Sequence, residues 1–198
     1  VFVSRGDAGL TANLQAFYLW LDNFSSQRQP LFVVDAHAWS DSMSAARLNI
    51  DAKSDATVMP LIASIRAHRA IDRVCVGSFV DRRIKKCRQE LGSELCTSMG
   101  KFEAARLWLA SRGLADTTQI VAACAQVPIR LSVNVATPAL VDLAHSLNIQ
   151  VHVWTVDEPD QMRALLDWGV DGIMTDQPRI LRDVLINRGV WAPEGVLQ

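Results

Sequence analysis

The sequence predicts an α/β protein of successive parallel strands, arranged either as a doubly wound sheet or as a (β/α)₈ barrel. About six segments with a strand pattern are each followed by a segment with helical periodicity. The loops between them have the short length that is typical of α/β proteins. The 198 residues suffice for one domain with a real core, or for a shortened version of a larger single-domain fold.

The upstream units extend from residue 47 to residue 147. Strand patterns at 47–53, 73–79, 94–99 and 119–128 each precede an apolar-periodic helix, and the last of these helices ends near Leu147. The first helix has apolar periodicity through Val58, Leu61, Ile62 and Ile65, the second runs through Ile84 and Leu91, and the third holds Leu107 and Leu109.

The next unit begins at Val151. A strand pattern in which Val151, Val153 and Thr155 alternate with His152, Trp154 and Val156 stops at Asp157. Pro159 suits the first turn of a helix, and Gly169 suits the left-handed position at its end. The apolar stripe of this helix is Met162, Leu165 and Leu166.

The last unit repeats the cycle. Residues 172–175 form a short strand, Asp176 is a candidate N-cap, and Pro178 is an early helical residue. The expected buried face of the final helix is Ile180, Leu181, Val184 and Leu185.

Composition excludes several functional classes. A net charge of −1 gives no strong field toward nucleic acid or anionic lipid, so no nucleic-acid partner is expected. The longest apolar runs, such as 121–125, fall far short of the roughly 20 residues of a bilayer span, and no secretory signal opens the chain. The four cysteines lack C-x-x-C pairing and are interpreted as reduced core thiols, which favours a cytoplasmic protein.

Residues at the carboxyl ends of the strands carry the functional information, because reactions in such barrels take place there. They are Asp51, Lys53, Ser78, Phe79, Gln126, Trp154, Thr175 and Asp176. Asp51 and Lys53 are two positions apart on one strand, so their side chains leave the same face. A carboxylate and an ammonium in one barrel indicate a divalent metal and an anion such as phosphate, or else a buried ion pair that fills the barrel.

Four ordered motifs resemble the glycerophosphodiester phosphodiesterase family. They are "NIDAKSD", "DRVCVGSF", "VHVWTVDEP" and "GVDGIMTDQP", and the match covers about three quarters of the chain, from Arg47 onward. The resemblance implies a (β/α)₈ TIM barrel of the phosphodiesterase type, shortened or incomplete in its N-terminal part, with residues 1–198 as a single domain. It also implies metal-dependent hydrolysis of a small-molecule glycerophosphodiester to an alcohol and glycerol 3-phosphate.

The resemblance assigns roles to individual residues. Members hold Mg²⁺ or Ca²⁺ with carboxylates, one of them at Asp51, where Glu is usual; the shorter Asp suits a flexible Ca²⁺ shell better than an octahedral Mg²⁺ shell. Lys53 lies where the family has its phosphate-contacting lysine, and it is therefore both a catalytic and a substrate-binding candidate. Trp154 lies where an aromatic wall borders the glycerol pocket, and Phe79 is a further substrate-binding candidate.

Other polar positions carry weaker signals. Ser78 and Phe79 are also compatible with packing at the barrel mouth. Thr175 and Asp176 are expected to cap the last helix and close the barrel. The remaining signals concern histidines: His68 and His145 are expected at the surface or in packing contacts, and His152 could point either way.

The N-terminal quarter departs from the family pattern. In "VFVSRGDAGLTANLQAF", Ser4 stands where the family has a catalytic His and Ala12 where it has a Glu, whereas Arg5 is kept and is a catalytic candidate. The family's His-Asp hairpin has no counterpart. Residues 30–42 fit either a strand that retains Asp35 as a metal ligand, with His37 as a possible substitute base, or the helix before 47–53, which would leave seven barrel strands.

Three hypotheses follow from the missing histidine pair. The chain is a working phosphodiesterase with rearranged residues, an inactive descendant that binds a phosphodiester or a partner protein, or a shortened reading of an active gene. A phosphatidylinositol-type phospholipase barrel would need a histidine pair that is equally missing. The sequence gives no signal for oligomeric state or substrate head group.

Overall fold

The computed structural model describes residues 19–20 and 48–191, and within them it contains the expected strand–helix units in unbroken succession. The units are β2 (Leu48–Asp51) with α1 (Val58–Ala67), β3 (Val74–Gly77) with α2 (Asp81–Leu91), β4 (Cys96–Thr97) with α3 (Lys101–Ala110), β5 (Cys124–Pro128) with α4 (Pro138–Ser146), β6 (Gln150–Trp154) with α5 (Pro159–Asp167), and β7 (Gly172–Ile173) with α6 (Pro178–Asn187). The boundaries agree with the sequence patterns, although most strands are shorter than expected.

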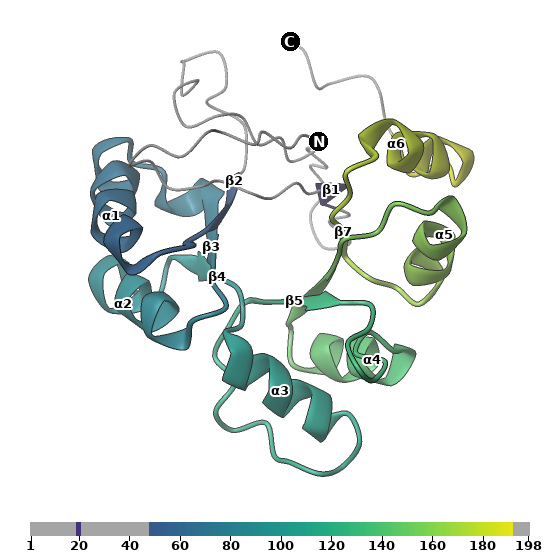
Figure 1. The fold of residues 1–198 in the computed structure, drawn as a ribbon, viewed down its shortest axis with the longest axis horizontal. Helices are drawn as coiled ribbons and strands as arrows, with labels where there is room; N and C mark the ends of the chain where they lie inside the picture. Colours follow the sequence, from purple (N-terminus) through teal and green to yellow (C-terminus); the bar gives the residue numbers. More distant parts are fainter. Residues whose placement is uncertain (1–18, 21–47, 192–198) are drawn as a thin grey trace.

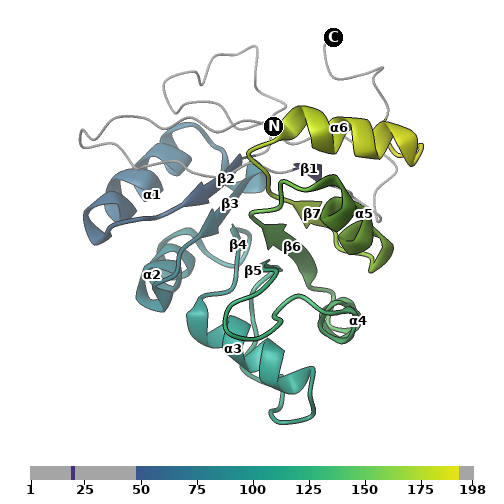
Figure 2. The ribbon, with the colours of Figure 1, turned by 45° about the vertical axis from the view of Figure 1, so that its right-hand side comes forward.

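The strands form an arc of a barrel. One sheet has the order β2-β3-β4 and the other the order β1-β7-β6-β5, where β1 is Leu19–Trp20. An isolated parallel bridge between Ser98 and Cys124 connects the end of β4 to the start of β5. Pairs of consecutive strands from β2 to β7 are parallel, and the helices lie outside them (Figure 1). Figure 2 shows β6 beside β5 and β7 on the inner side of α4 and α5.

The pairing of β1 was not expected. β1 runs antiparallel to β7, with Leu19 opposite Ile173 and Trp20 opposite Gly172. The strands of the strand–helix units pair in parallel among the described residues. Parallel pairing is what the right-handed crossover of a βαβ unit requires. The described strands therefore form an incomplete barrel with an antiparallel strand at one edge.

The core lies between the strands and the inward faces of the helices. The four predicted residues of α1 are buried, as are Met162, Leu165 and Leu166 in α5 and Leu181, Val184 and Leu185 in α6. In α3 the two leucines differ, because Leu109 is 37% exposed whereas Leu107 is fully buried. Two successive steps of about 100° place Leu109 on the opposite face of α3 from Leu107.

The end of α5 follows the sequence prediction. The helix ends at Asp167, and Gly169 has a φ of 86°, which is a left-handed conformation that a glycine adopts without steric cost. The chain then turns directly into β7, which brings the carboxyl end of that strand to the same edge as the end of β6.

The four cysteines are thiols, as predicted. Cys75, Cys87 and Cys124 are buried, and Cys96 is half-buried.

Of the helices in residues 48–191, none combines the length and the hydropathy that crossing a bilayer requires.

Candidate functional site

The strand-end residues named from the sequence line a single cavity of about 640 Å³. Asp51, Lys53, Ser78, Phe79, Gln126, Trp154, Thr175 and Asp176 all border it. The volume lies within the range of small-molecule sites. The cavity lies at the carboxyl ends of the strands, the end of such a barrel where reactions take place.

Asp51 and Lys53 form an ion pair at the mouth of this cavity. Nζ of Lys53 lies 2.5 Å from Oδ2 of Asp51, and the two side chains are 36% and 18% exposed, respectively. The pair is therefore accessible from solvent, which excludes the alternative of a buried ion pair that fills the barrel. Oδ1 of Asp51 accepts no hydrogen bond from the described residues. The carboxylate thus offers one oxygen to the lysine, while its other oxygen is buried and accepts no hydrogen bond from the described residues.

The backbone between these two residues is held by α2 and β3. The carbonyl oxygen of Ala52 accepts hydrogen bonds from Oγ of Ser78 at 2.9 Å and from Nη1 of Arg83 at 3.0 Å. The same guanidinium donates to the carbonyl of Lys53 at 2.7 Å. These bonds fix the direction of both site side chains, so Ser78 supports the segment rather than merely filling the barrel mouth.

An aromatic wall stands beside the ion pair. The rings of Phe79 and Trp154 meet edge to face at 5.5 Å between centroids and 87° between planes. Nζ of Lys53 lies 5.7 Å from the centre of the Phe79 ring, within the range of a cation–π contact. Phe79 remains 58% exposed, so this wall has a face available to a ligand.

The predicted capping role of Asp176 is wrong. Helix α6 begins at Pro178, so Gln177 takes the N-cap position. Oγ1 of Thr175 accepts the N–H of Gln177 at 2.9 Å and donates to Oδ1 of Asp157 at 2.8 Å. The backbone N–H of Asp176 also donates to that oxygen. Thr175 and Asp157 therefore tie the end of β7 to the loop after β6, while the Asp176 side chain borders the cavity.

Two of the histidines have structural surroundings. Nε2 of His145 lies 2.8 Å from Oδ2 of the buried Asp171, which also accepts the N–H of Val151 at 2.8 Å. His68 is exposed at the C-cap of α1, with Nδ1 2.9 Å from the carbonyl of Ser64. Neither histidine borders the cavity, in agreement with the interpretation from the sequence.

His152 points into the barrel. Its ring is buried, and a Cβ at Gly172 would lie 2.8 Å from Cδ2 of the ring, so the glycine leaves room for it. Burial lowers the pKa of His152 to about 4, against the opposing attraction of Asp171. The imidazole is therefore neutral at physiological pH.

Acidification is expected to destabilise the fold through His152. The pKa of about 4 in the folded state lies below the ordinary value of 6.5, so the neutral ring contributes stability above pH 6.5 that is lost as the pH falls toward 4. The loss amounts to about 3 kcal/mol. The free energy of unfolding by urea, measured at pH 7 and at a pH near 4, gives this loss. A His152→Gln variant should lose less stability over the same interval, and equal losses in the two proteins would contradict this expectation.

Several residues of the cavity were not predicted from the sequence. Lys101 borders it from the first position of α3 and brings a second ammonium group. Asn49 borders the cavity floor, where its Oδ1 accepts a hydrogen bond from Nε2 of Gln126 at 3.0 Å. Trp108 lies on α3, within a helix rather than at a strand end. The position of Lys101 just after the fourth strand is a signal that could have identified it.

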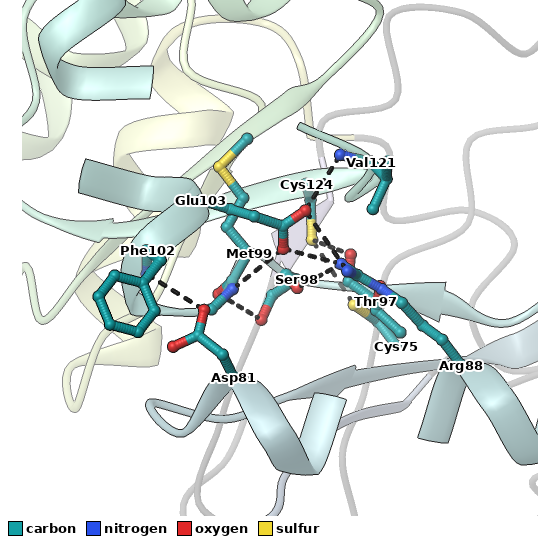
Figure 3. Close-up of polar contacts among 11 residues, drawn as sticks. Cys75, Asp81, Arg88, Thr97, Ser98, Met99, Phe102, Glu103, Val121 and Cys124 are labelled. Atoms are coloured by element: carbon teal, nitrogen blue, oxygen red, sulfur yellow. Dashed lines mark hydrogen bonds and ion pairs between the residues drawn. The ribbon is translucent and has the colours of Figure 1, made fainter. Parts of the chain in front are cut away.

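A network of hydrogen bonds holds the start of α3 beside the cavity (Figure 3). Nη2 of Arg88 lies 3.0 Å from Oε2 of Glu103, and its Nε donates to Oγ1 of Thr97 at 2.8 Å. Oε1 of Glu103 accepts the N–H of Val121, and Oδ1 of Asp81 accepts the N–H of Phe102. These contacts join α2, β4, α3 and the chain before β5, and so position Lys101.

The residues present fit a hard divalent cation in part. Asp51 supplies a carboxylate oxygen that has no other partner among the described residues, and oxygen is the donor that Mg²⁺ and Ca²⁺ prefer. Within residues 48–191, however, no three carboxylates or imidazoles lie close enough together to enclose an ion. The other candidates, Asp35 as a ligand and Arg5 as a catalytic residue, lie outside the described residues, as does His37.

The fold and the cavity define a parallel α/β barrel with an acid–lysine pair and an aromatic wall at its carboxyl-terminal mouth. The chain belongs to the glycerophosphoryl diester phosphodiesterase family, whose model matches residues 37–180. The resemblance noted in the four sequence motifs is thereby confirmed, and so is the barrel type.

Relatives of known name agree with this family. Over 151 residues the chain is 42% identical to the probable glycerophosphodiester phosphodiesterase 2 of Mycobacterium tuberculosis, a match that covers 73% of the chain and 57% of the relative. A shorter match of 36 residues, 56% identical, relates 18% of the chain to 13% of a dermonecrotic toxin of Loxosceles apachea.

Solved structures share the fold. A putative glycerophosphoryl diester phosphodiesterase from Silicibacter pomeroyi superimposes with a TM-score of 0.59 at 27% identity, over 74% of this chain and 52% of that one. A glycerophosphodiester phosphodiesterase from Parabacteroides distasonis gives the same TM-score at 20% identity, over 74% and 60% of the two chains. The chain thus spans little more than half the length of the proteins it matches.

Proposed function

We propose that this chain belongs to an enzyme that hydrolyses glycerophosphodiesters to an alcohol and glycerol 3-phosphate with the help of a divalent cation. The observation that carries the proposal is the placement of Asp51, Lys53 and Trp154 around one cavity at the strand ends. Membership of the family, which is metal-dependent, supports the same reaction. In this proposal residues 1–198 form one barrel domain.

Asp51 is proposed as a ligand of Mg²⁺ or Ca²⁺, with Asp35 as a second ligand. Such a cation, when bound, neutralises phosphoryl charge and can activate a nucleophile. The unpartnered oxygen supports this role, because Oδ1 of Asp51 is buried and accepts no hydrogen bond from the described residues. The shorter Asp in place of the usual Glu favours the flexible shell of Ca²⁺.

Lys53 is proposed to contact the phosphate, and Arg5 to assist catalysis. An ammonium group acts as a point charge toward phosphate oxygens, and Lys53 is held at the cavity mouth by the bonds of Arg83 to its backbone. Trp154 and Phe79 would then border the glycerol moiety with their ring faces. The proposed substrate is a small phosphodiester, and nucleic acid is not a proposed partner.

Turnover is the direct test of this function. The purified chain is incubated with glycerophosphocholine and either Mg²⁺ or Ca²⁺, and released glycerol 3-phosphate is measured. We expect release that stops when a chelator is added. Binding of the substrate without release in the presence of either ion would contradict the hydrolytic function and would identify an inactive binding protein.

Replacement of Trp154 by Ala should weaken substrate binding more than cation binding. The indole supplies apolar contact area to the glycerol part of the ligand but no cation ligand, so we expect the Kd for glycerol 3-phosphate to rise about tenfold, in line with about 1–2 kcal/mol for loss of a packed aromatic surface. Cation affinity should stay unchanged. Calorimetric titrations with glycerol 3-phosphate and with Ca²⁺ measure the two effects.

A matched control is Trp168→Ala, which removes an indole that is 38% exposed at the end of α5 and does not border the cavity. This variant should bind glycerol 3-phosphate like the wild type. A Trp154→Ala protein with wild-type affinity for glycerol 3-phosphate would remove the aromatic wall from the proposal.

The proposed location is a reducing compartment, the cytoplasm. The four cysteines support it, because all of them are thiols, including the half-buried Cys96.

A further inference from the structure

Three cysteines from three consecutive strands come together inside the barrel. Cys75 lies on β3, Cys96 on β4 and Cys124 on β5, and their sulfur atoms all lie within 4.8 Å of one another. Sγ of Cys75 is 3.6 Å from Sγ of Cys124, and both residues are labelled in Figure 3. We call these three residues the thiol cluster.

The spacing of the thiol cluster matches the coordination of a thiophilic metal ion. Three sulfurs bonded to one ion at about 2.3 Å must lie about 3.8–4.0 Å apart in tetrahedral or trigonal geometry. The observed separations, from 3.6 Å up to a limit of 4.8 Å, bracket this value. Small rotations of the side chains would therefore bring all three sulfurs to bonding distance.

The surroundings of the cluster suit thiolates. Nε2 of Gln126 lies 3.6 Å from Sγ of Cys124 and 3.8 Å from Sγ of Cys75, so its amide N–H groups face two sulfurs. Donors in this position stabilise the negative charge of metal-bound thiolates in a low-dielectric interior. Cys96 is half-buried and provides a route from solvent to a site whose other two ligands are buried.

The cluster is separate from the proposed hard-cation site but adjacent to it. Gly77, Ser98 and Gln126, each two residues beyond one of the three cysteines, all border the cavity. Residues two apart on a strand share one face, so the sulfurs form the layer of the barrel interior directly beneath the cavity floor. Gln126 contacts both layers and connects the cluster to the floor residue Asn49.

Without a metal ion, the thiols are neutral. Contacts with the thiols of Cys124 and Cys96, together with burial, hold the pKa of Cys75 well above its usual range. A bound ion would displace these protons, which is the usual consequence of metal binding by cysteine. Soft sulfur donors select Zn²⁺ or Cu⁺ over Mg²⁺ and Ca²⁺.

We propose that Cys75, Cys96 and Cys124 form a binding site for one thiophilic metal ion, Zn²⁺ or Cu⁺, beneath the floor of the cavity. Three thiolates complete a trigonal Cu⁺ site. Zn²⁺ would take a fourth ligand, for which water has access beside Cys96. The site is independent of the hard cation that the proposed hydrolysis uses.

The test is a titration of the reduced chain with Co²⁺ under anaerobic conditions. We expect an intense near-ultraviolet band from thiolate-to-cobalt charge transfer that saturates at one ion per chain. Excess Zn²⁺ should remove the band, whereas Mg²⁺ and Ca²⁺ should leave it. Competition with a Cu⁺-specific chelator measures the affinity for Cu⁺ separately. The affinities for Zn²⁺ and Cu⁺ are then compared, and the ion with the higher affinity is the preferred occupant.

Single serine variants locate the site. Cys75→Ser, Cys96→Ser and Cys124→Ser should each weaken Co²⁺ binding by about 100-fold or more, because each removes one of three anionic ligands. The matched control is Cys87→Ser, which changes a buried thiol of α2 outside the cluster. A band of equal strength in all four variants, or no band in the folded wild-type chain, would overturn the proposal.

A second measurement uses the unchanged protein, so it does not depend on whether the variants fold. Zn²⁺ should slow the alkylation of Cys96 by about tenfold or more, because a metal-bound thiolate is withdrawn from the reagent. Mass spectrometry of peptides reports each cysteine separately, and the rate at Cys87 should not change. Equal alkylation rates of Cys96 with and without Zn²⁺ would contradict the site, whether or not the chain hydrolyses phosphodiesters.

Discussion

The Asp51→Asn variant is expected to lose affinity for Mg²⁺ or Ca²⁺ by about 100-fold or more. The change keeps the shape of the side chain but removes the anionic charge, and hard cations depend on charged oxygen ligands. Oδ1 of Asp51 accepts no hydrogen bond from the described residues, so no protein donor competes for it. Calorimetric titration with each ion measures the affinity, and turnover of glycerophosphocholine should fall in parallel.

The matched control for this variant is Asp55→Asn. Asp55 lies four residues further along the chain, is paired with Arg82 and Arg83, and does not border the cavity. Its replacement changes the net charge by the same amount and should leave cation affinity close to the wild-type value. Equal titrations for wild type and Asp51→Asn would remove Asp51 from the proposed metal site.

The Lys53→Met variant is expected to have the second large effect. Methionine keeps most of the unbranched side chain but removes the ammonium, so a phosphate in the cavity would lose one positive charge that lines it. We expect kcat to fall by about 10²–10³-fold, as for loss of an electrostatic group that stabilises a transition state. Cation affinity should be equal or higher, because Asp51 no longer shares its charge with Lys53.

The control for Lys53→Met is Lys86→Met. Lys86 pairs with Glu90 on α2 and lies outside the cavity, so its loss should not affect turnover. A Lys53→Met protein that hydrolyses glycerophosphocholine at the wild-type rate would contradict the role proposed for Lys53. Loss of cation binding together with turnover would indicate instead that the change disturbs Asp51.

The strand–helix succession could be predicted because its signals are local. The apolar stripe of α1 and the glycine that ends α5 depend on neighbouring residues, and the structure confirms both. The proximity of the strand-end residues could also be predicted, because the parallel strands of one barrel end at the same rim. Asp51, Lys53 and Trp154 accordingly border one cavity although they are far apart in the sequence.

Other features depend on three-dimensional packing and have no local signal. The antiparallel pairing of β1 with β7 joins segments about 150 residues apart, and no pattern within either segment specifies it. Gln126 was recognised as a strand-end residue, but its contacts with Asn49 and two sulfurs depend on which strands are neighbours. The predicted N-cap of α6, Asp176, was wrong by one residue, because the helix begins at Pro178 and Gln177 is its N-cap.

The thiol cluster explains why cysteine spacing alone was uninformative. Cys75, Cys96 and Cys124 are separated by whole helices, so no C-x-x-C motif exists, yet the parallel register places Cys75 opposite Cys96. The sequence led to an interpretation as reduced core thiols. The burial of Cys75, Cys87 and Cys124 confirms the core location for three of the four, whereas Cys96 is half-buried. The strand order brings Cys75, Cys96 and Cys124 together.

The central claim is that a cation and a phosphoryl group bind side by side at Asp51 and Lys53. It is tested most directly by titrating glycerol 3-phosphate into the wild-type chain with and without saturating Ca²⁺, and then Mg²⁺. We predict that one of the ions raises the affinity for glycerol 3-phosphate by about 5–150-fold, the range of ordinary coupling between two ligands. An affinity for glycerol 3-phosphate that neither ion changes would contradict a shared site.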